Sequence, residues 1–391
     1  MKIAIVGYGT AGQAAAILLA RAGHAIEIFE RSEELRPVGA GFLLQPTGLG
    51  VLDKLGLREA ALASGERIER LHGANANGRM VMDMHYADLA PNLFGLGMTR
   101  GALFALLHAR CADGATIRTG TPIVALREEG RGLVDDDGNE FGPYDLVVVA
   151  DGSNSTLRGA SDLVARAPLY PWGAMWCLLP ADGWPHACEL RQRYVGTRTM
   201  LGVLPVGARP DHGADTRWLT FYYSLPGERV DAFDATALAQ LQADVAALWP
   251  QLAERTCVLV DPSQLNRARY RDVVLRRPWH GRCVFIGDAA HGMSPQLGQG
   301  VNMALLDAQA IADSLAMHTN IESAFAHYAH ERKRHVAIYQ FLSRWLTPLF
   351  QSDHDMLAPL RDTFFGPLGR LPIARKQMLR ILSGTRRGWL R

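Results

Sequence analysis

Two glycine-rich turns carry the clearest chemical signal in this chain, because each leads into a helix whose free N–H groups can hold an anion. The first turn reads Gly7-x-Gly9-x-x-Gly12. In such a turn the first glycine permits the bend, the second lets a pyrophosphate approach the backbone, and the third lets the helix pack on the strand. The unpaired N–H groups and the positive dipole end of the helix then hold the phosphates. The first turn therefore predicts a site for an ADP moiety.

The residues on both sides of this turn complete a strand–helix–strand unit. The β-rich runs at 2–6 and 25–29 predict strands, and the Ala/Leu periodicity of 10–22 predicts a helix that stops at Gly23. Glu30 follows the second strand, where a carboxylate can accept hydrogen bonds from ribose hydroxyls. These residues leave both NAD and FAD open as the ligand, because both present an ADP moiety.

The second turn lies in the stretch "GDAAHGMSPQLGQGVNMALLDA", residues 287–308. An apolar run at 283–286 predicts a strand, and an apolar stripe predicts a helix over about 301–317. Gly298-Gln299-Gly300 would line the N-terminus of that helix. A second anion site suits FAD, whose flavin end must be held far from its ADP end. The helix N-terminus would stabilise negative charge at the N1–C2 edge of the reduced flavin, and Asp288 could accept hydrogen bonds from the ribitol hydroxyls.

A third motif, "YDLVVVADGSNSTLR", has the same design. Its apolar run at 146–150 predicts a buried strand that ends in Asp151-Gly152. Three glycine turns, each at the end of a strand, indicate one long ligand that is contacted from three places.

Together these motifs resemble those of the class A flavin-dependent monooxygenases, the flavoprotein aromatic hydroxylases with the p-hydroxybenzoate hydroxylase fold. That family carries a GxGxxG, a DG and a GD fingerprint, which here read "GYGTAG", "DGSNSTLR" and "GDAAHGMSPQLGQGVN". The stretches "PVGAGFLLQPTGLGVLDKLGL" and "MTRGALFALL" extend the resemblance, which covers residues 1–330. It implies an α/β fold in which a Rossmann-like FAD-binding domain is interleaved with a β-sheet substrate domain and followed by a C-terminal helical segment.

The resemblance also implies how the chain is divided. The FAD-binding domain is expected to combine 1–72, 98–162 and 272–330, with 73–97 and 163–271 forming the substrate domain and 331–391 the C-terminal segment. The residue pattern agrees, because 191–207 and 216–227 read as strands separated by turn residues. The stretch 234–252 reads as one amphipathic helix.

The resemblance implies FAD as a bound, non-covalent cofactor, with NAD(P)H and O₂ as co-substrates. In the family the arginine at the position of Arg100 reaches the FAD, the loop at 41–44 passes close to it, the backbone near Val124 meets the adenine, and Arg31 lies near the adenosine. The expected cofactor-binding residues are Gly7, Gly9, Ala11, Gly12, Glu30, Arg31, Gly41, Leu43, Arg100, Val124, Asp151, Asp288, Pro295, Gly298, Gln299, Gly300, Val301 and Asn302.

The reaction implied by the resemblance belongs to the cofactor. NAD(P)H reduces FAD, O₂ adds to give a flavin C4a-hydroperoxide, and the distal oxygen passes to an aromatic or conjugated small molecule. No side chain is predicted as a catalytic acid or base, and His291 is interpreted as a structural hydrogen-bonding group in its turn. The sequence contains no HExxH, Cys/His cluster or GxSxG motif, so no metal site is predicted.

Four residues on the expected covering sheet are candidates to contact the substrate: Trp176, Tyr194, Met200 and Tyr222. Because side chains alternate along a strand, each has an even chance of facing away from the pocket, and core packing is the competing interpretation.

Three other functions stay open at this point. The first is a reductase or flavin halogenase on the same scaffold, although the halogenase pattern GWxWxIP is absent. The second is an NAD-linked dehydrogenase, which the GD stretch disfavours. The third is a non-catalytic flavin-binding partner protein, which would be yellow but would show no substrate-stimulated NAD(P)H oxidation.

Composition adds limits on partners and location. A net charge of +2 over 391 residues gives no indication of nucleic-acid binding. The five cysteines are widely scattered, which favours buried, reduced thiols in a soluble cytoplasmic protein. Residues 331–391 are basic with interleaved apolar residues, which fits either a helical brace across the two domains or a peripheral membrane or partner contact.

Overall fold

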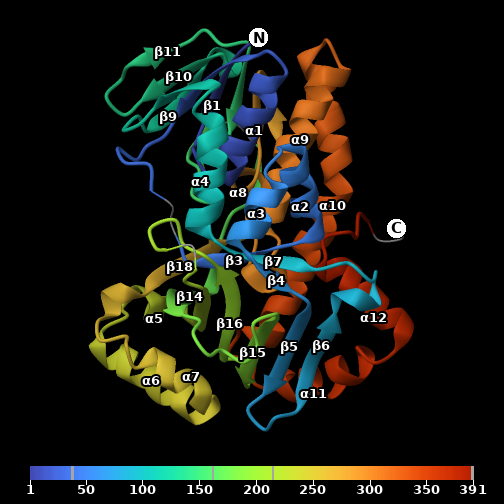
Figure 1. The fold of residues 1–391 in the computed structure, drawn as a ribbon. Helices are drawn as coiled ribbons and strands as arrows, with labels where there is room; N and C mark the ends of the chain where they lie inside the picture. The colour runs from blue at the N-terminus through green and yellow to red at the C-terminus, as the bar shows by residue number, and fades with distance from the viewer. Residues whose placement is uncertain (37–38, 161–162, 214, 389–391) are drawn as a thin grey trace.

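Two large β-sheets organise the computed structural model, which describes residues 1–36, 39–160, 163–213 and 215–388. Figure 1 shows the first sheet and its helices in the upper half of the molecule and the second sheet in the lower half. The helices of the C-terminal segment run from one half to the other.

The first sheet is mostly parallel. Its strand order is β20 (Trp279–His280), β21 (Cys283–Phe285), β12 (Leu146–Val149), β1 (Lys2–Val6), β2 (Ala25–Phe29) and β8 (Ala115–Arg118). Only the edge strand β20 pairs antiparallel. Ile3, Ala4 and Ile5 are fully buried, as expected of a parallel strand that is covered on both faces.

Helices cover one face of this sheet and a small antiparallel sheet covers the other. The helices are α1 (Thr10–Arg21), α2 (Pro46–Lys54), α3 (Arg58–Ser64), α4 (Arg100–Cys111) and α9 (Gly300–Met317). The small sheet consists of β9 (Ile123–Arg127), β10 (Gly132–Asp135) and β11 (Glu140–Phe141). The predicted strands and helices at 2–6, 10–22, 25–29, 146–150, 283–286 and 301–317 are therefore confirmed to within one residue at each end.

The second sheet has seven strands and is mostly antiparallel. Its strand order is β18 (Asn266–Arg271), β14 (Leu169–Pro180), β17 (Trp218–Pro226), β16 (Thr199–Gly207), β15 (Glu189–Val195), β5 (Arg70–Asn75) and β6 (Met80–His85). Residues before 86 thus pair with residues beyond 188 through the parallel contact of β5 with β15.

Two helices cover the outer face of this second sheet. They are α6 (Ala235–Leu248) and α7 (Pro250–Thr256), which pack on side chains such as Leu201 and Phe221. The prediction of a single helix over 234–252 is wrong, because the chain breaks at Trp249. Pro250 has no N–H and restricts the residue before it, so α6 ends and α7 starts at the proline.

A three-stranded sheet of β3 (Gly41–Leu44), β7 (Gly95–Thr99) and β4 (Glu66–Ile68) joins the two halves. Glycine is required where it touches the second sheet, because a Cβ at Gly41 would overlap with the hydroxyl of Thr220. Short elements complete the fold: β13 (Val164–Arg166), β19 (Val274–Leu275), α5 (Gly227–Asp231) and α8 (Asp288–His291).

The C-terminal segment consists of α10 (Ile321–Phe350), α11 (Leu357–Leu368) and α12 (Pro372–Leu382). Helix α10 packs along α9, while α11 and α12 pack on β6 of the second sheet. The segment therefore contacts both halves of the molecule, as a helical brace requires. In the part of the chain that the structure describes, no helix has the length and apolar character needed to cross a bilayer.

Candidate functional site

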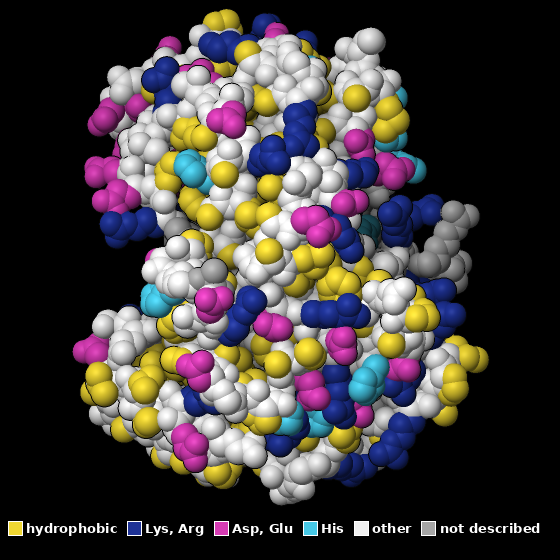
Figure 2. Space-filling model, in the orientation of Figure 1, with side chains coloured by type: hydrophobic (Ala, Val, Ile, Leu, Met, Phe, Trp, Pro, Cys, Tyr) yellow, Lys and Arg dark blue, Asp and Glu magenta, His cyan; other side chains and the backbone are white. Residues whose placement is uncertain are grey.

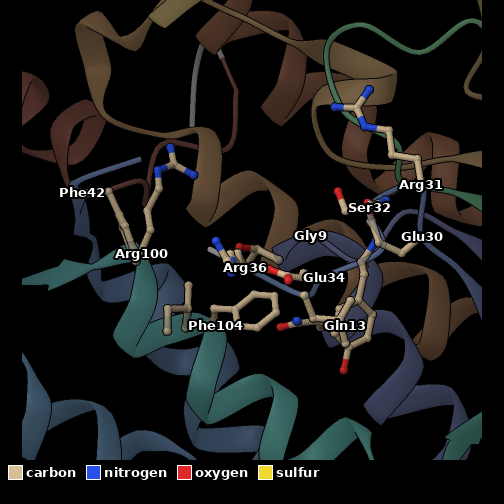
Figure 3. Close-up of a pocket in the computed structure, with 14 residues that line it drawn as sticks. Gly9, Gln13, Glu30, Arg31, Ser32, Glu34, Arg36, Phe42, Arg100 and Phe104 are labelled. Carbon is tan, nitrogen blue, oxygen red and sulfur yellow. Dashed lines mark hydrogen bonds and ion pairs between the residues drawn. The ribbon is translucent and has the colours of Figure 1, made fainter. Parts of the chain in front are cut away.

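A cavity of about 240 Å³ opens beside the first glycine turn (Figure 3). Its lining includes four of the predicted residues, Gly9, Glu30, Arg31 and Arg100. The C-terminal ends of β1 and β2 and the N-terminus of α1 meet at the carboxyl edge of the first sheet. This edge is where ligands bind in open α/β sheets.

The three glycines of the first turn differ in what surrounds their Cβ positions. Gly7 has a φ of +103°, and a Cβ there would lie 2.5 Å from the carbonyl oxygen of Ala150. A Cβ at Gly12 would overlap with the carbonyl oxygen of Gly7, so only glycine lets α1 pack this closely. Gly9 faces open space, with no atom within 4 Å of the position of its Cβ. The backbone at Gly9 is therefore open to a phosphate at the N-terminus of α1.

Polar groups around the turn have free atoms that can hydrogen-bond to the hydroxyl and amide groups of a ligand. The Glu30 carboxylate accepts hydrogen bonds from the backbone N–H groups of Tyr8, at 2.8 Å, and Ser32, at 3.0 Å. Each carboxylate oxygen keeps a free lone pair for a ribose hydroxyl. The Gln13 side chain is fully buried, and neither of its amide atoms has a partner. Such groups are rarely left unpaired in native proteins, so their arrangement fits FAD.

Two arginines that line the cavity, Arg31 and Arg100, form no ion pair with another residue of the described chain, whereas Arg36 pairs with Glu34. The Arg100 guanidinium lies 6.0 Å from the centre of the Phe42 ring, and a Cβ at Gly39 would contact its Cδ at 2.7 Å. The side chain is therefore held at the mouth of the cavity by neighbours from the 39–42 loop.

The second turn presents an open helix N-terminus. Gly298 is left-handed with a φ of +60°, α9 begins at Gly300, and the position of a Cβ at Gly300 lies 3.9 Å from Asp288 Oδ1. Asn302 fixes the turn, because its Oδ1 accepts from the Gln45 N–H at 2.8 Å and its Nδ2 donates to the Gly298 carbonyl at 3.2 Å. An exposed carboxylate and a bare helix end therefore lie side by side, as a flavin and its ribitol chain require.

The DG motif lies against the GD motif. The Asp151 carboxyl is buried, its Oδ1 has no partner, and burial raises its pKa to about 6. The Arg158 guanidinium donates to the carbonyl oxygens of Ser153, at 2.6 Å, and Ala289, at 3.0 Å. This buried arginine joins the two motifs, a role that no local sequence pattern could assign.

A buried network behind the GD motif was not predicted. The Asp307 carboxylate has no exposed surface and accepts from Gly287 N–H at 2.8 Å, from His291 Nε2 at 2.5 Å and from Arg332 Nε at 2.6 Å. The interpretation of His291 as a structural hydrogen-bonding group is confirmed. Asp307 lies three residues after Ala304 and four before Ile311 on the apolar stripe of α9. A carboxylate at such a position could have indicated a buried ion pair.

The network continues into the C-terminal segment and gives a pH-dependent prediction. His335 Nδ1 accepts from Arg332 at 2.8 Å, and its Nε2 donates to the Gly384 carbonyl at 3.1 Å. Burial and the neighbouring Arg332 guanidinium lower the pKa of His335 to about 3. Because an unfolded histidine titrates near pH ~6.5, the unfolded chain binds a proton that the folded chain excludes. Stability should therefore fall as the pH drops from about 6.5 towards 3.

We expect His335→Gln to flatten this dependence, because glutamine can replace both hydrogen bonds without titrating. Urea unfolding at several pH values between about 7 and 4.5 measures how the free energy of unfolding depends on pH. His72, whose pKa burial and nearby arginines lower to about 4, contributes in the same direction to both proteins. The exposed His354 provides the control, since His354→Gln should leave the pH profile unchanged. Parallel profiles for wild type and His335→Gln would contradict the prediction.

Other predicted cofactor residues have mixed placements. Gln299 Nε2 donates to the Leu382 carbonyl at 2.8 Å, and the Leu43 carbonyl accepts from Asn302 at 3.4 Å. The side chain of Leu43 itself is buried between the sheets.

Val124 is 48% exposed on β9 and does not line the cavity. Ala11 lies in α1, with its Cβ 3.1 Å from the position of a Cβ at Gly287, so the two turns abut. The remaining two, Pro295 and Val301, lie half-buried on either side of Gly298.

The four candidate substrate residues come together on one face. Trp176, Tyr194, Met200 and Tyr222 all point away from α6 and α7 and form one aromatic cluster. The rings of Trp176 and Tyr222 are 5.3 Å apart.

Two further residues complete the cluster and were missed. Gln192 Oε1 accepts from the Tyr194 hydroxyl at 2.7 Å, and Gln192 also donates to the Tyr222 hydroxyl. Trp176 Nε1 donates to the Tyr270 hydroxyl at 3.1 Å. Burial raises the pKa of Tyr270, and the charge of Arg100, which lines the cavity, opposes this rise.

Cysteines and possible metal ligands contribute nothing to this site. Cys111, Cys177 and Cys283 are buried, but the expectation of buried thiols is wrong for Cys188 and Cys257, which are exposed on loops beside short surface elements. Among the described residues, no group of three or more His, Cys, Asp or Glu side chains is arranged to hold a metal ion.

The family model described as "FAD binding domain" matches residues 1–340. The chain belongs to this family and, with the three motifs at one edge of the sheet, to the class A flavin-dependent monooxygenases. FAD is its cofactor, and the enzyme uses NAD(P)H and O₂ to hydroxylate an aromatic or conjugated small molecule.

Known relatives cover most of the chain. An aurachin C monooxygenase/isomerase of Stigmatella aurantiaca is 31% identical over 342 residues, which are 84% of each chain. A putative 2-heptyl-3-hydroxy-4(1H)-quinolone synthase of Rhodococcus erythropolis is 28% identical over 88% of this chain and 86% of its own. A variant of Klebsiella pneumoniae HpxO solved with FAD has the same fold, with a TM-score of 0.81 and 21% identity over 98% of this chain and 99% of its own.

Proposed function

We propose that the substrate is a planar nitrogen heteroaromatic compound of the 4-quinolone type, bound against the aromatic cluster of the second sheet. The observation that carries this proposal is the cluster itself, in which Trp176 and Tyr222 lie 5.3 Å apart and Tyr270 accepts a hydrogen bond from Trp176. The names of two relatives, which refer to an aurachin and a quinolone, support the ring type. Flat aromatic ligands suit a pocket of aromatic walls with few polar groups.

We infer that the chain is divided as the family resemblance implies. The FAD-binding domain would combine 1–72, 98–162 and 272–330, and the substrate domain 73–97 and 163–271. The strand order supports this interleaving, because β5 pairs with β15 of the 163–271 region and β6 extends the same sheet beyond β5. Residues 331–391 would brace the two domains.

When bound, FAD would supply the redox chemistry, in which NAD(P)H is the reductant, one oxygen atom of O₂ enters the substrate and the other leaves as water. The protein's part is to bind, orient and exclude water. The N-terminus of α1 would hold the pyrophosphate. Glu30 would bind the ribose, Arg31 would lie near the adenosine, and Arg100 would reach the FAD. The N-terminus of α9 would stabilise negative charge at the flavin end.

Substrate orientation would come from neutral hydroxyl groups. Burial raises the pKa values of Tyr194, Tyr222 and Tyr270 well above that of a free phenol, so all three hydroxyls stay protonated at neutral pH. A neutral hydroxyl both donates and accepts, which suits the carbonyl or hydroxyl group of a heteroaromatic ring. The rings themselves would exclude water from the reacting carbon.

Tyr270→Phe tests this proposal. We expect the variant to raise KM for the accepted substrate by roughly five- to tenfold, because one hydrogen bond contributes about 1 kcal/mol. The measurement is NAD(P)H oxidation with 4-quinolones and other aromatic compounds, together with incorporation of labelled oxygen from O₂ into the product.

Tyr223→Phe is the matched control, since Tyr223 lies on the outer face and bonds Asp244. It should leave KM unchanged while both variants retain FAD. Equal KM values for Tyr270→Phe and wild type would contradict the proposed pocket. Failure of every aromatic compound to stimulate NAD(P)H oxidation would contradict the substrate class.

A further inference from the structure

The outer side of helix α11 carries an unusual row of exposed apolar side chains. Met356, Leu360, Phe364 and Leu368 recur every fourth residue and therefore lie on one side of the helix. Leu371 and Ile373 continue the row into the start of α12. These six residues, which we call the tail surface, are 44% to 90% exposed. Contiguous apolar patches of this kind mark binding surfaces for membranes or partners.

The opposite side of α11 is firmly anchored to the rest of the molecule. The buried Arg361 guanidinium donates to the carbonyl oxygens of Gly196 and Leu349, both at 2.9 Å. Phe365 packs against Phe350 at a ring distance of 6.0 Å. The helix is thus a fixed part of the fold, and the exposure of its outer side is not a consequence of loose packing.

Basic side chains lie beside the tail surface, and the acidic residues near it are paired. Asp353 and Asp355, just before Met356, bond Arg198, and Asp88 pairs with Arg375. Within residues 356–376 the only acidic residue is Asp362, which bonds Asn75 at 2.7 Å. Arg370 and Lys376 are exposed beside the apolar row. Figure 2 shows hydrophobic side chains next to Lys and Arg side chains at this lower-right corner of the molecule, where Figure 1 places α12.

The whole C-terminal segment has the same bias. Residues 331–391 contain twelve Lys and Arg against four Asp and Glu, a net charge of +8, so residues 1–330 carry a net charge of −6. An isologous contact between two copies would place two strongly positive segments against each other, which is unfavourable. An anionic bilayer offers both an apolar interior for the row and negative headgroups for the basic side chains.

We propose that the tail surface docks on an anionic lipid bilayer, with α11 lying in the interface plane. The outer side of α11 enters the headgroup boundary, while Arg370 and Lys376 contact lipid phosphates. Because Phe350 also contacts Tyr194 at a ring distance of 5.1 Å, α11 stands between the lipid and the aromatic cluster. Docking itself does not depend on the identity of the substrate.

Sedimentation with sucrose-loaded vesicles tests the proposal on the full-length, FAD-loaded protein. We expect binding to vesicles that contain phosphatidylglycerol, much weaker binding to pure phosphatidylcholine, and a loss of binding at high salt. Leu360→Ser/Phe364→Ser should lower the partition coefficient roughly tenfold or more, because both side chains would lose their burial in lipid. Arg370→Glu/Lys376→Glu should abolish the preference for anionic lipid.

The matched control is Val258→Ser/Val260→Ser, which removes two apolar side chains that are 53% and 82% exposed beyond α7. It should bind vesicles as wild type does, and FAD absorbance should verify that all variants are folded. Equal binding of Leu360→Ser/Phe364→Ser and wild type would overturn the proposal. Absence of binding to vesicles that contain phosphatidylglycerol would also overturn the proposal. If the protein then formed a dimer that Leu360→Ser/Phe364→Ser dissociates, the face would join two copies of the chain.

Discussion

Asp307→Ala is expected to destabilise the protein by about 3–5 kcal/mol, because it leaves the buried Arg332 guanidinium without its counter-charge. Burial alone would raise the pKa of Asp307, but the charges of His291 and Arg332 outweigh it and hold the pKa well below the usual range. The carboxylate therefore contributes stability at every pH above about 4, the pKa of an unfolded aspartate. Chemical denaturation at neutral pH measures the loss.

Asp313 provides the control on the same helix. Its carboxylate is half-exposed and lies 4.0 Å from Lys54, so Asp313→Ala should change stability by less than about 1 kcal/mol. The double variant Asp307→Ala/Arg332→Ala should be less destabilised than the sum of its single variants, since the two groups interact directly. Additive effects would show that the carboxylate and the guanidinium are not coupled.

Asp307→Ala should also release FAD more readily, because the carboxylate holds the Gly287 N–H of the GD motif.

The second large effect is expected from Gly9→Ala and Gly12→Ala, which separate cofactor binding from folding. At Gly9 the φ of −76° is ordinary and nothing lies near the added methyl group, so the FAD-free protein should keep its stability within about 0.5 kcal/mol. The methyl group would occupy the approach of the pyrophosphate, and we expect FAD affinity to fall roughly a hundredfold. At Gly12 the methyl group would overlap with the Gly7 carbonyl oxygen, so the fold itself should be damaged.

Fluorescence titration with FAD and thermal unfolding of the FAD-free protein measure the two effects. Gly23→Ala is unsuitable as a control because its φ is +82°. Gly50→Ala in α2 is suitable, since its Cβ position meets nothing within 4 Å and lies away from the cavity. If Gly9→Ala bound FAD as tightly as Gly50→Ala, the pyrophosphate could not lie at the first turn.

Local signals made much of the cofactor half predictable. The strands at 2–6 and 25–29 and the helix over 301–317 follow from hydrophobic periodicity, and the glycine roles follow from backbone sterics within a few residues. The break at Trp249 was also present in the sequence, because Pro250 disfavours a continuous helix. Such features depend on neighbours along the chain, so they can be read without the tertiary structure.

The unpredicted parts depend on residues that are distant in sequence. Arg158 reaches Ala289 across 131 positions, and Arg332 reaches Asp307 across 25. Because side chains alternate along a strand, Trp176 on β14 and Tyr222 on β17 could each lie on either face of the sheet. Only the packing of α6 and α7 decides which face is left free. Tyr270 gave no signal, because its role depends on a side-chain hydrogen bond with Trp176 on the neighbouring strand β14, 94 positions away in sequence.

The hydrogen bonds from Gln299 to the Leu382 carbonyl and from His335 to the Gly384 carbonyl have a consequence for biosynthesis. The second glycine turn is therefore completed by a residue that lies 83 positions further along the chain. A nascent chain can form its first glycine turn early, but it can finish the second only after Leu382 and Gly384 have emerged from the ribosome. A truncation before position 382 would remove both carbonyl partners and leave this turn incomplete.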